Sequence, residues 1–415
     1  MTKNRLLSFD FLFLCLITFL ALCNVTVFYN FHLYLQDIGL SGKNAGFLVG
    51  LSSLTTMLLY VVASDRIQLR NSLSTMLIGI AMAAGCGMAY LFADNFWSLA
   101  IVRMINGTAV FLVMASCMVI FVKIIPPQKS GLAFSLYSVA LLLPYTIIPI
   151  LSETIRPYTD NPAKIYTLTA CLLLPASLLA LTMRARTTGD AQDANLTRTD
   201  KHHNSSKKRN ILRKPVFSIL FINGVYFTIF SALFYLFAGY ALEKGVENSA
   251  IFFTVQMGVM IAIRLFGGKL FDKVSKVVLV TIALLLTGAG LTLLRTMPDT
   301  TWLLPTAAVF GLGMGLCVPP LNSLMYLVSD PQFRGYNANM MMLTVHLGTF
   351  IGPFTGAWLI ETGGYDLFLK TAIITTFAGA GFFLTINPDK DSQLQQLNPP
   401  MQDPQDDPRP VYTIR

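Results

Sequence analysis

The sequence predicts an all-α membrane protein whose helices form two similar six-helix halves. Three observations predict this fold class: the composition, the length of the apolar stretches and an internal repeat. Of the 415 residues, 54% are hydrophobic and only 12% are charged, and the mean hydropathy is +0.60. Soluble domains carry about 25% charged residues. This chain therefore has too few charges to cover a water-facing surface of its size, and lipid is the solvent that fits it.

Twelve apolar stretches have the length of a membrane-spanning helix, which needs about 20 residues. In the first half they lie near 7–32, 44–63, 72–92, 97–121, 130–152 and 164–183. In the second half they lie near 215–240, 247–267, 276–296, 302–327, 336–360 and 367–386. Turn or charge signals such as Pro126-Pro127 and Gly363-Gly364 separate them. The first stretch is longer than the apolar part of a cleavable signal, so we expect it to span the membrane.

One long hydrophilic segment divides the twelve stretches six and six. The predicted domains are an N-terminal bundle over 1–184, a linker over 185–214, a C-terminal bundle over 215–387 and a disordered tail over 388–415. The linker is polar and poor in aromatic residues, which is typical of flexible segments. Its His202-His203 pair is expected to be solvated, and no metal site is predicted.

The positions of lysine and arginine predict the orientation. Twenty-two of the 30 basic residues lie on the side of the N-terminus and six on the opposite side, while Arg103 and Arg264 fall within helices. Basic residues favour the cytoplasmic side. We therefore expect both termini in the cytoplasm, and we read the net charge of +9 as a sign of topology, not of nucleic-acid binding.

The two halves repeat each other at a nearly constant offset. Gly39 aligns with Gly245, Gly107 with Gly311, and Pro149 with Pro353. Pro127-Gln128-x-x-Gly131 likewise aligns with Pro331-Gln332-x-x-Gly335. Six helices return the chain to its starting side, so the copies are parallel repeats about an axis along the membrane normal. This geometry predicts a central site between the halves and favours a carrier over a pore or a receptor.

A charged motif follows the second helix of each half. The second copy reads Gly268-x-x-x-Asp272-Lys273-Val274-Ser275-Lys276, and the first keeps Asp65-Arg66 and Arg70 but has Val61 at the glycine position. These residues resemble the signature of the major facilitator superfamily. The resemblance implies a charge lock that favours one facing of the carrier; ordinary interfacial charge is the alternative. Arg264, one turn before Gly268, is expected to extend this cluster.

The fourth helix contains Arg103-Met104-Ile105-Asn106-Gly107, which resembles the arginine-to-glycine motif of the same family. Arg103 and Gly107 share one helix face. A charge inside a membrane helix is costly unless it meets water or a partner. We expect Arg103 to act in substrate or proton handling; snorkelling toward the outer surface is the alternative.

The resemblance also implies that helices one, four, seven and ten line the cavity. The candidate substrate-binding residues are the polar and aromatic side chains of these helices. They are Asn24, Asn30, His32, Tyr34, Arg103, Asn106, Asn223, Tyr226, Tyr235, Asn322 and Tyr326. Each tyrosine is equally compatible with an interfacial position.

Few groups are available for proton coupling. His346 lies near the predicted midplane of the eleventh helix, and its side chain titrates near physiological pH; a neutral histidine bonded between helices is the alternative. Asp10 and Glu153 are the remaining candidates. The glycine-proline motif of the family's antiporters belongs to the fifth helix. Here a similar run, Gly348-x-x-x-Gly352-Pro353, lies in the eleventh.

Several function classes are disfavoured. No P-loop or catalytic triad is evident, the six cysteines lie in apolar runs without metal-type spacing, and no cofactor is expected. We predict a monomeric secondary transporter of a small organic molecule in a bacterial inner membrane, working by proton-coupled export. Proton-coupled uptake is the runner-up, and a sensor or a membrane enzyme on the same fold is less favoured.

Overall fold

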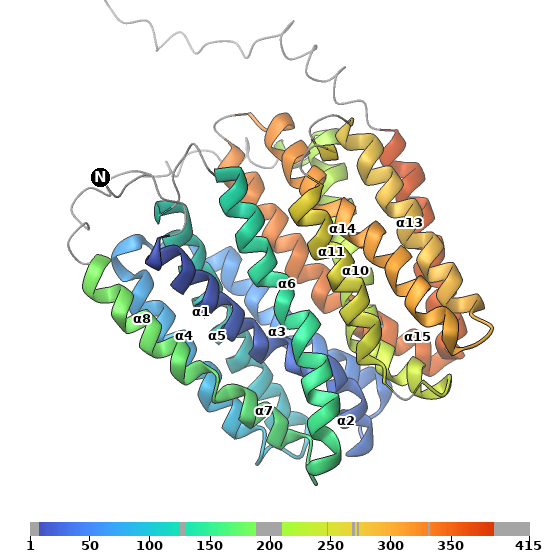
Figure 1. Ribbon diagram of the computed structural model, residues 1–415, viewed down its shortest axis with the longest axis horizontal. Helices are drawn as coiled ribbons and strands as arrows, with labels where there is room; N and C mark the ends of the chain where they lie inside the picture. The colour runs from blue at the N-terminus through green and yellow to red at the C-terminus, as the bar shows by residue number, and fades with distance from the viewer. Residues whose placement is uncertain are drawn as a thin grey trace, which may run out of the picture.

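The computed structural model is helical throughout the part of the chain that it describes (Figure 1). The described residues are 8–124, 130–187, 210–246, 248–267, 270–271, 274–330 and 333–385. Ten helical segments are long and apolar enough to cross a membrane, and the shorter helix α11 (Ala250–Phe266) is apolar too. The longest segment is broken into two arms, so the described chain holds twelve candidate spans. The predicted all-α membrane fold is confirmed.

The first half contains six spans. They are α1 to α2 (Phe9–Thr26, then η1 Val27–Asn30 and Phe31–Asp37), α3 (Gly42–Ala63), α4 (Leu69–Ala89), α5 (Phe96–Ile124), α6 (Ser130–Ile155) and α7 to α8 (Ala163–Ala170 and Leu173–Thr187). The first span is longer than expected, because the chain stays helical through a 3-10 turn and continues to Asp37. The sixth breaks after Ala170.

The second half follows the same order. Its spans are α10 (Lys214–Glu243), α11, α13 (Lys276–Thr296), α14 (Leu303–Val328, after the 3-10 turn η6 at Thr300–Trp302) and α15 (Arg334–Leu384). Within α15 the backbone leaves helical geometry at Gly363 and Gly364, and Gly364 has φ of 70°. This break divides α15 into the eleventh and twelfth spans. Most of the predicted linker (residues 188–209) and the whole predicted tail lie outside the described residues.

The helix ends define two faces of the molecule. The face that carries the start of α1 is called the Phe9 face, and the opposite face, with the turn after α2, is called the Gly39 face. Gly39 and Gly245 form equivalent turns on that face, each with a positive φ, of 91° and 71°. Only glycine adopts this region without strain, so the repeat seen in the sequence is also a repeat of backbone geometry.

The repeat extends to helix packing. A methyl group in place of the Gly107 hydrogen would lie 2.2 Å from the Ser52 carbonyl oxygen, and one at Gly311 would lie 2.7 Å from that of Gln256. Ser52 and Gln256 are 204 positions apart, as are the two glycines. The fourth helix of each half therefore touches the second helix at the same place, through a residue without a side chain.

The hydrophobic core shows where the halves join. One cluster of buried residues includes α2, the first part of α3 and nearly all of the second half. A second cluster, with Phe11, Met76, Phe121 and Ala180, belongs to the first half alone and lies toward its Phe9 face. The cores of the two halves are thus continuous toward the Gly39 face, while the first half keeps its own core toward the Phe9 face.

Two helix pairs make most of the junction, α3 with α15 and α6 with α11, and α10 adds contacts with η1 and α2. Figure 1 shows α6 and α11 side by side between the halves. Along α3, Gly42, Gly46 and Gly50 face the first arm of α15. A methyl group at Gly46 would lie 2.5 Å from the Pro353 carbonyl oxygen. Small residues at this spacing allow the close helix contact that drives association in lipid.

Candidate functional site

Arg103 lies buried in α5, with 2% of its surface exposed. Its Nε donates to the carbonyl oxygen of Leu48 at 3.0 Å, and its Nη2 donates to the carbonyl oxygen of Val49 at 2.5 Å and to Ser52 Oγ at 2.8 Å. All three acceptors are on α3. These protein oxygens replace the water molecules that would surround the guanidinium at the surface, and this offsets the cost of burying its charge.

Two aromatic rings complete the surroundings of the guanidinium. Its carbon lies 4.8 Å from the ring centre of Phe28 and 5.1 Å from that of Phe31. Tyr90 and Tyr166 pack edge-on against Phe31 and at a tilt against Phe28, with ring centres 4.7 to 5.8 Å apart. A cation over aromatic faces is stabilised electrostatically, and more so when desolvated. Arg103 thus joins three spans of the first half.

Asn24 and Asn106 line one small cavity inside the first half. Both are buried, and the Asn24 amide donates to the carbonyl oxygen of Thr169 on α7 at 3.0 Å. The other lining residues are apolar, for example Ala83 and Val113. The structure therefore brings these two predicted residues together, in a space enclosed by spans of a single half.

Asn30 and Tyr34 line a second small cavity, toward the Gly39 face. Asn30 Oδ1 and the Tyr166 hydroxyl, which belongs to another lining residue, have no hydrogen-bond partner among the described residues. Buried polar atoms of this kind are usually satisfied by water. His32, between Asn30 and Tyr34 in the sequence, is also buried, and its Nε2 likewise has no hydrogen-bond partner among the described residues.

In the second half, the predicted residues of α10 bond to neighbouring helices. The Asn223 amide donates to the carbonyl oxygen of Met341 at 3.1 Å and to Thr344 Oγ1 at 2.9 Å, both on α15. The Tyr226 hydroxyl donates to the carbonyl oxygen of Met314 on α14 at 3.0 Å. Each bond lies within the second half and gives a polar side chain the hydrogen-bond partner that lipid cannot supply.

Aromatic side chains of α10 meet the first half. The rings of Tyr226, Phe230 and Phe234 stack in nearly parallel steps with centres 6.3 Å apart. Tyr145 of α6 packs edge-on against Phe230 and Phe234, at 5.6 and 4.9 Å. Tyr235 is buried and packs against Phe234 at 5.1 Å. Of the predicted lining residues, Tyr226 belongs to this aromatic row and Tyr235 packs beside it.

The predicted residues of α14 lie elsewhere. Asn322 and Tyr326 are exposed in the last two turns of α14, toward the Phe9 face. The Arg334 guanidinium lies 4.1 Å from the Tyr326 ring centre and donates to its hydroxyl at 3.0 Å. The structure does not bring these two residues together with Asn24 or Asn106.

His346 lies on α15 at the boundary between the halves. Its ring stacks on Tyr60 of α3, with centres 5.3 Å apart and planes 22° apart. Tyr60 in turn packs edge-on against Phe111. His346 is therefore a titratable group at the contact between α3 and α15.

The carboxylates predicted for proton coupling have different positions. Asp10 is in the first turn of α1, at the Phe9 face. Glu153 is near the end of α6, at the Gly39 face, where its Oε1 accepts from the Tyr29 hydroxyl at 2.5 Å and from Ser249 Oγ at 2.8 Å. Tyr29 belongs to the same half as Glu153, and Ser249 to the other half.

The predicted gating residues are described only in part. Gly268, Asp272 and Lys273 lie outside the described residues, and the Asp65 side chain is not described. The remaining four lie toward the Phe9 face: Arg66 in η2 (Ser64–Arg66), Arg70 in the first turn of α4, Arg264 in the last turn of α11 and Lys276 at the start of α13. The charge lock stays a prediction.

Sequence reasoning missed three features of the junction: Glu361, Ser249 and the glycine face of α3. The spacing Gly42-x-x-x-Gly46-x-x-x-Gly50 was visible in the sequence and is a signal for close helix contact. Glu361 and Ser249 carry no such signal, because a single polar residue at a helix end is equally typical of the membrane surface.

Comparisons with known proteins agree with this architecture. Residues 14–353 match the description of the Major Facilitator Superfamily. A stretch of 108 residues is 32% identical to the multidrug resistance protein MdtH of Yersinia enterocolitica, and equally to that of Yersinia pestis. The match spans 26% of this chain and 26% of those relatives, so their whole-protein properties are not carried over by it.

Two solved transporters have a similar fold. A nucleoside transporter, NupG, aligns over 90% of this chain and 99% of its own, with a TM-score of 0.72 and 13% identity. A POT family transporter in complex with a thioalcohol-conjugated peptide aligns over 92% and 96%, with a TM-score of 0.73 and 14% identity. At these identities the likeness shows the fold alone.

The surroundings of Arg103 predict an unusual order of stability for two substitutions. Arg103→Lys keeps the buried charge but loses the planar fork that reaches three acceptors, so it should destabilise the protein by about 1–3 kcal/mol. Arg103→Met removes the charge and its desolvation cost together and should stay within about 1 kcal/mol. Thermal unfolding of purified protein in nanodiscs measures both. A lysine variant as stable as the parent would contradict the assignment of Arg103 to helix joining.

Proposed function

Because the chain belongs to the Major Facilitator Superfamily, we propose that it exports a small organic molecule across a bacterial inner membrane by proton-coupled alternating access. Family membership makes it a multi-pass membrane transporter of small molecules rather than an enzyme. Direction, coupling ion, orientation and monomeric state belong to the proposal.

The observation that carries alternating access is the uneven junction between the halves. Hydrogen bonds that cross it include those of Lys43 with Glu361, Ser249 with Glu153 and Thr254 with Thr146, and the buried core runs from one half into the other toward the same face. All three bonds lie in the part of the molecule toward the Gly39 face. Two rigid halves joined at one end fit a carrier whose other end gives access to the central site.

We infer the orientation from the charge distribution. With the basic Phe9 face in the cytoplasm, the Gly39 face is periplasmic, and the structure is the form that is closed to the outside. The aromatic row of Tyr226, Phe230 and Phe234 with Tyr145 then lies along the path from the cytoplasm. We propose these rings, with the predicted polar residues of the first half, as the substrate contacts.

Export is proposed as the direction because the similar stretch belongs to proteins named for multidrug resistance. Everted membrane vesicles that contain the protein should accumulate a fluorescent aromatic dye on energisation, and right-side-out vesicles should not. Vesicles without the protein are the control. The reverse pattern would favour uptake by symport, and no flux of any compound in a broad panel would favour a sensor.

Proton coupling is proposed to use His346. His346→Phe keeps an aromatic ring on Tyr60 but removes the titratable nitrogen, so flux driven by a pH gradient should fall at least tenfold while substrate exchange without a gradient persists. Tyr60→Phe, which keeps the stack and the histidine, should behave as the parent. Both are measured in proteoliposomes with an imposed pH gradient. Unchanged gradient-driven flux in His346→Phe would remove the proton role from this residue.

A further inference from the structure

We propose that two repeat-related carboxylate contacts, Glu153 with Ser249 and Glu361 with the Lys43 amide, keep the Gly39 face closed, and that this face opens when they break. The role of this opening in transport rests on the proposed function. The contacts themselves, and their effect on the distance between the halves, do not depend on it.

The first contact connects the end of α6 with the start of α11. Ser249 is the N-cap residue of α11 and is 5% exposed, and its hydroxyl donates to Glu153 at 2.8 Å. Glu153 also accepts from Tyr29, which belongs to its own half. Glu153 is thus held in place by one half and bonds to the other. A hydrogen bond to a charged acceptor away from bulk water is among the stronger ones.

The second contact connects the first arm of α15 with the start of α3. The Lys43 amide, in the first turn of α3, donates to Glu361 Oε2 at 2.7 Å. Amides in the first turn of a helix have no partner within the helix and favour a negative charge. A side chain at Gly42 would begin 3.4 Å from Glu361 Oε2, an ordinary contact distance, so Gly42 lies directly beside this carboxylate.

The charged and titratable groups around each carboxylate are few. Around Glu153 they are Tyr29 and, one turn later on the same helix, Arg156. Around Glu361 they are Lys43 and the buried imidazole of His32. Neither carboxylate forms an ion pair with another described residue within salt-bridge distance.

The two contacts are related by the internal repeat. Lys43 and Ser249 are 206 positions apart, the same offset as that of the turn glycines Gly39 and Gly245. The carboxylates lie near the ends of the fifth and eleventh spans, which are related by the repeat. When Pro149 is aligned with Pro353, Glu361 lies one helical turn beyond the position equivalent to Glu153. Each half therefore supplies one carboxylate and one donor.

This arrangement places one contact on each side of the axis between the halves. A rocking motion that separates the Gly39 ends must break both, whereas relaxation within one half breaks neither. The glycine face of α3 supplies the close packing between these points, and the two polar contacts fix its position. The pair should therefore set the ratio of open to closed molecules at this face.

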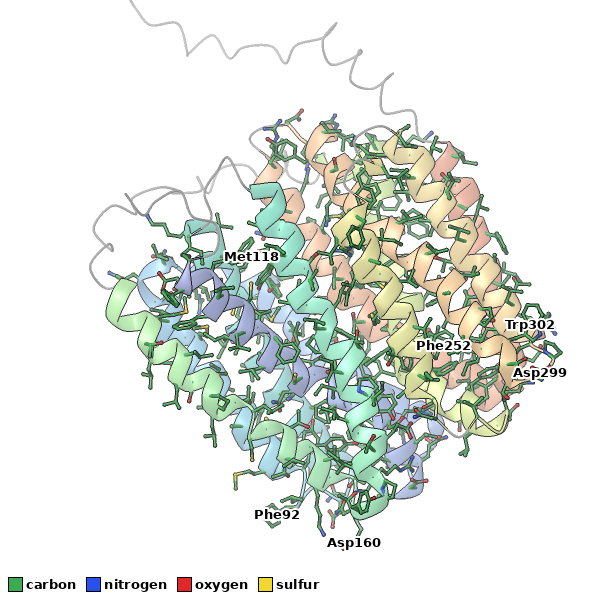
Figure 2. The ribbon with its side chains drawn as sticks, in the orientation of Figure 1. Phe92, Met118, Asp160, Phe252, Asp299 and Trp302 are labelled. Carbon is green, nitrogen blue, oxygen red and sulfur yellow. The ribbon has the colours of Figure 1, made fainter. Side chains whose placement is uncertain are left out.

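The experiment measures that ratio directly in the full-length protein. Spin labels at Asp160→Cys and Pro298→Cys, on a background without the six native cysteines, report the distance between the halves by double electron–electron resonance in nanodiscs. Both positions are exposed; Asp160 and Asp299, next to Pro298, lie at the Gly39 ends of the two halves (Figure 2). No substrate is needed, so the readout is independent of transport.

The variants separate contacts between the halves from contacts within one. Ser249→Ala removes only the bond that crosses the junction and should raise the open-to-closed ratio about five- to tenfold. Glu361→Ala, at an exposed carboxylate, should raise it about two- to threefold, and the double variant should raise it further.

Two variants serve as controls. Tyr29→Phe removes the bond within the first half and keeps the ring. Glu243→Ala removes an exposed carboxylate of the same face that makes no hydrogen bond to another described residue. Neither control should widen the distance.

A distance distribution in the double variant identical to that of the parent would overturn the proposal, as would an equal shift in Glu243→Ala. Dye flux in the same preparations tests the proposed function separately. If the variants open as expected but the protein moves no compound, the proposed role of the contacts stands and the proposed transport function fails. If the protein transports dye but no variant shifts the distance, only the proposed role of the contacts fails.

Discussion

Close approach of α3 to the first arm of α15 is the contact on which the arrangement of the two halves depends. In lipid there is no hydrophobic drive to bring helices together, so association rests on packing and on polar contacts. Gly42, Gly46 and Gly50 present a side-chain-free surface, and the backbone at Phe350 and Pro353 lies directly against it. A larger residue at Gly46 or Gly50 would separate the helices and, with them, the continuous core of the Gly39 face. The carboxylate contacts and the aromatic row occupy positions that this approach creates.

The two halves share a backbone arrangement but differ in the side chains at equivalent buried positions. The residue equivalent to Arg103 at the offset of 204 is Ala307, and that equivalent to Asn106 is Phe310. In the second half this region is filled by Phe310, which packs against Phe252. In the first half it holds a cation, its carbonyl acceptors and two aromatic rings. In this region a repeated backbone thus carries a buried cation in the first half and a phenylalanine in the second.

Much of the fold could be predicted from the sequence because the membrane imposes a strong constraint. Span length, the repeat offset and the equivalent turns at Gly39 and Gly245 all follow from local pattern. The length of the first span could not be predicted, because its continuation through Val27–Asn30 depends on packing against α10. The candidate site was harder still. Asn223 and Tyr226 look like cavity residues in the sequence, but whether an amide faces a cavity or a neighbouring carbonyl is decided by helix rotation, which a pattern of apolar residues leaves open. Glu361 was missed because its partner, the Lys43 amide, is a main-chain group more than 300 positions away.

Under the proposed function, these features belong to a carrier in one of its two facings, joined at the Gly39 face and able to open there. The most direct test is to lock that face. The Cβ position of Gly42 lies 3.7 Å from Glu361 Cβ, which is within the range that a disulfide bridges. In a background free of the native cysteines, oxidised Gly42→Cys/Glu361→Cys protein in proteoliposomes should lose substrate flux, and reduction should restore it. Undiminished flux in the fully cross-linked protein would contradict the account, because transport would then proceed without opening of this face.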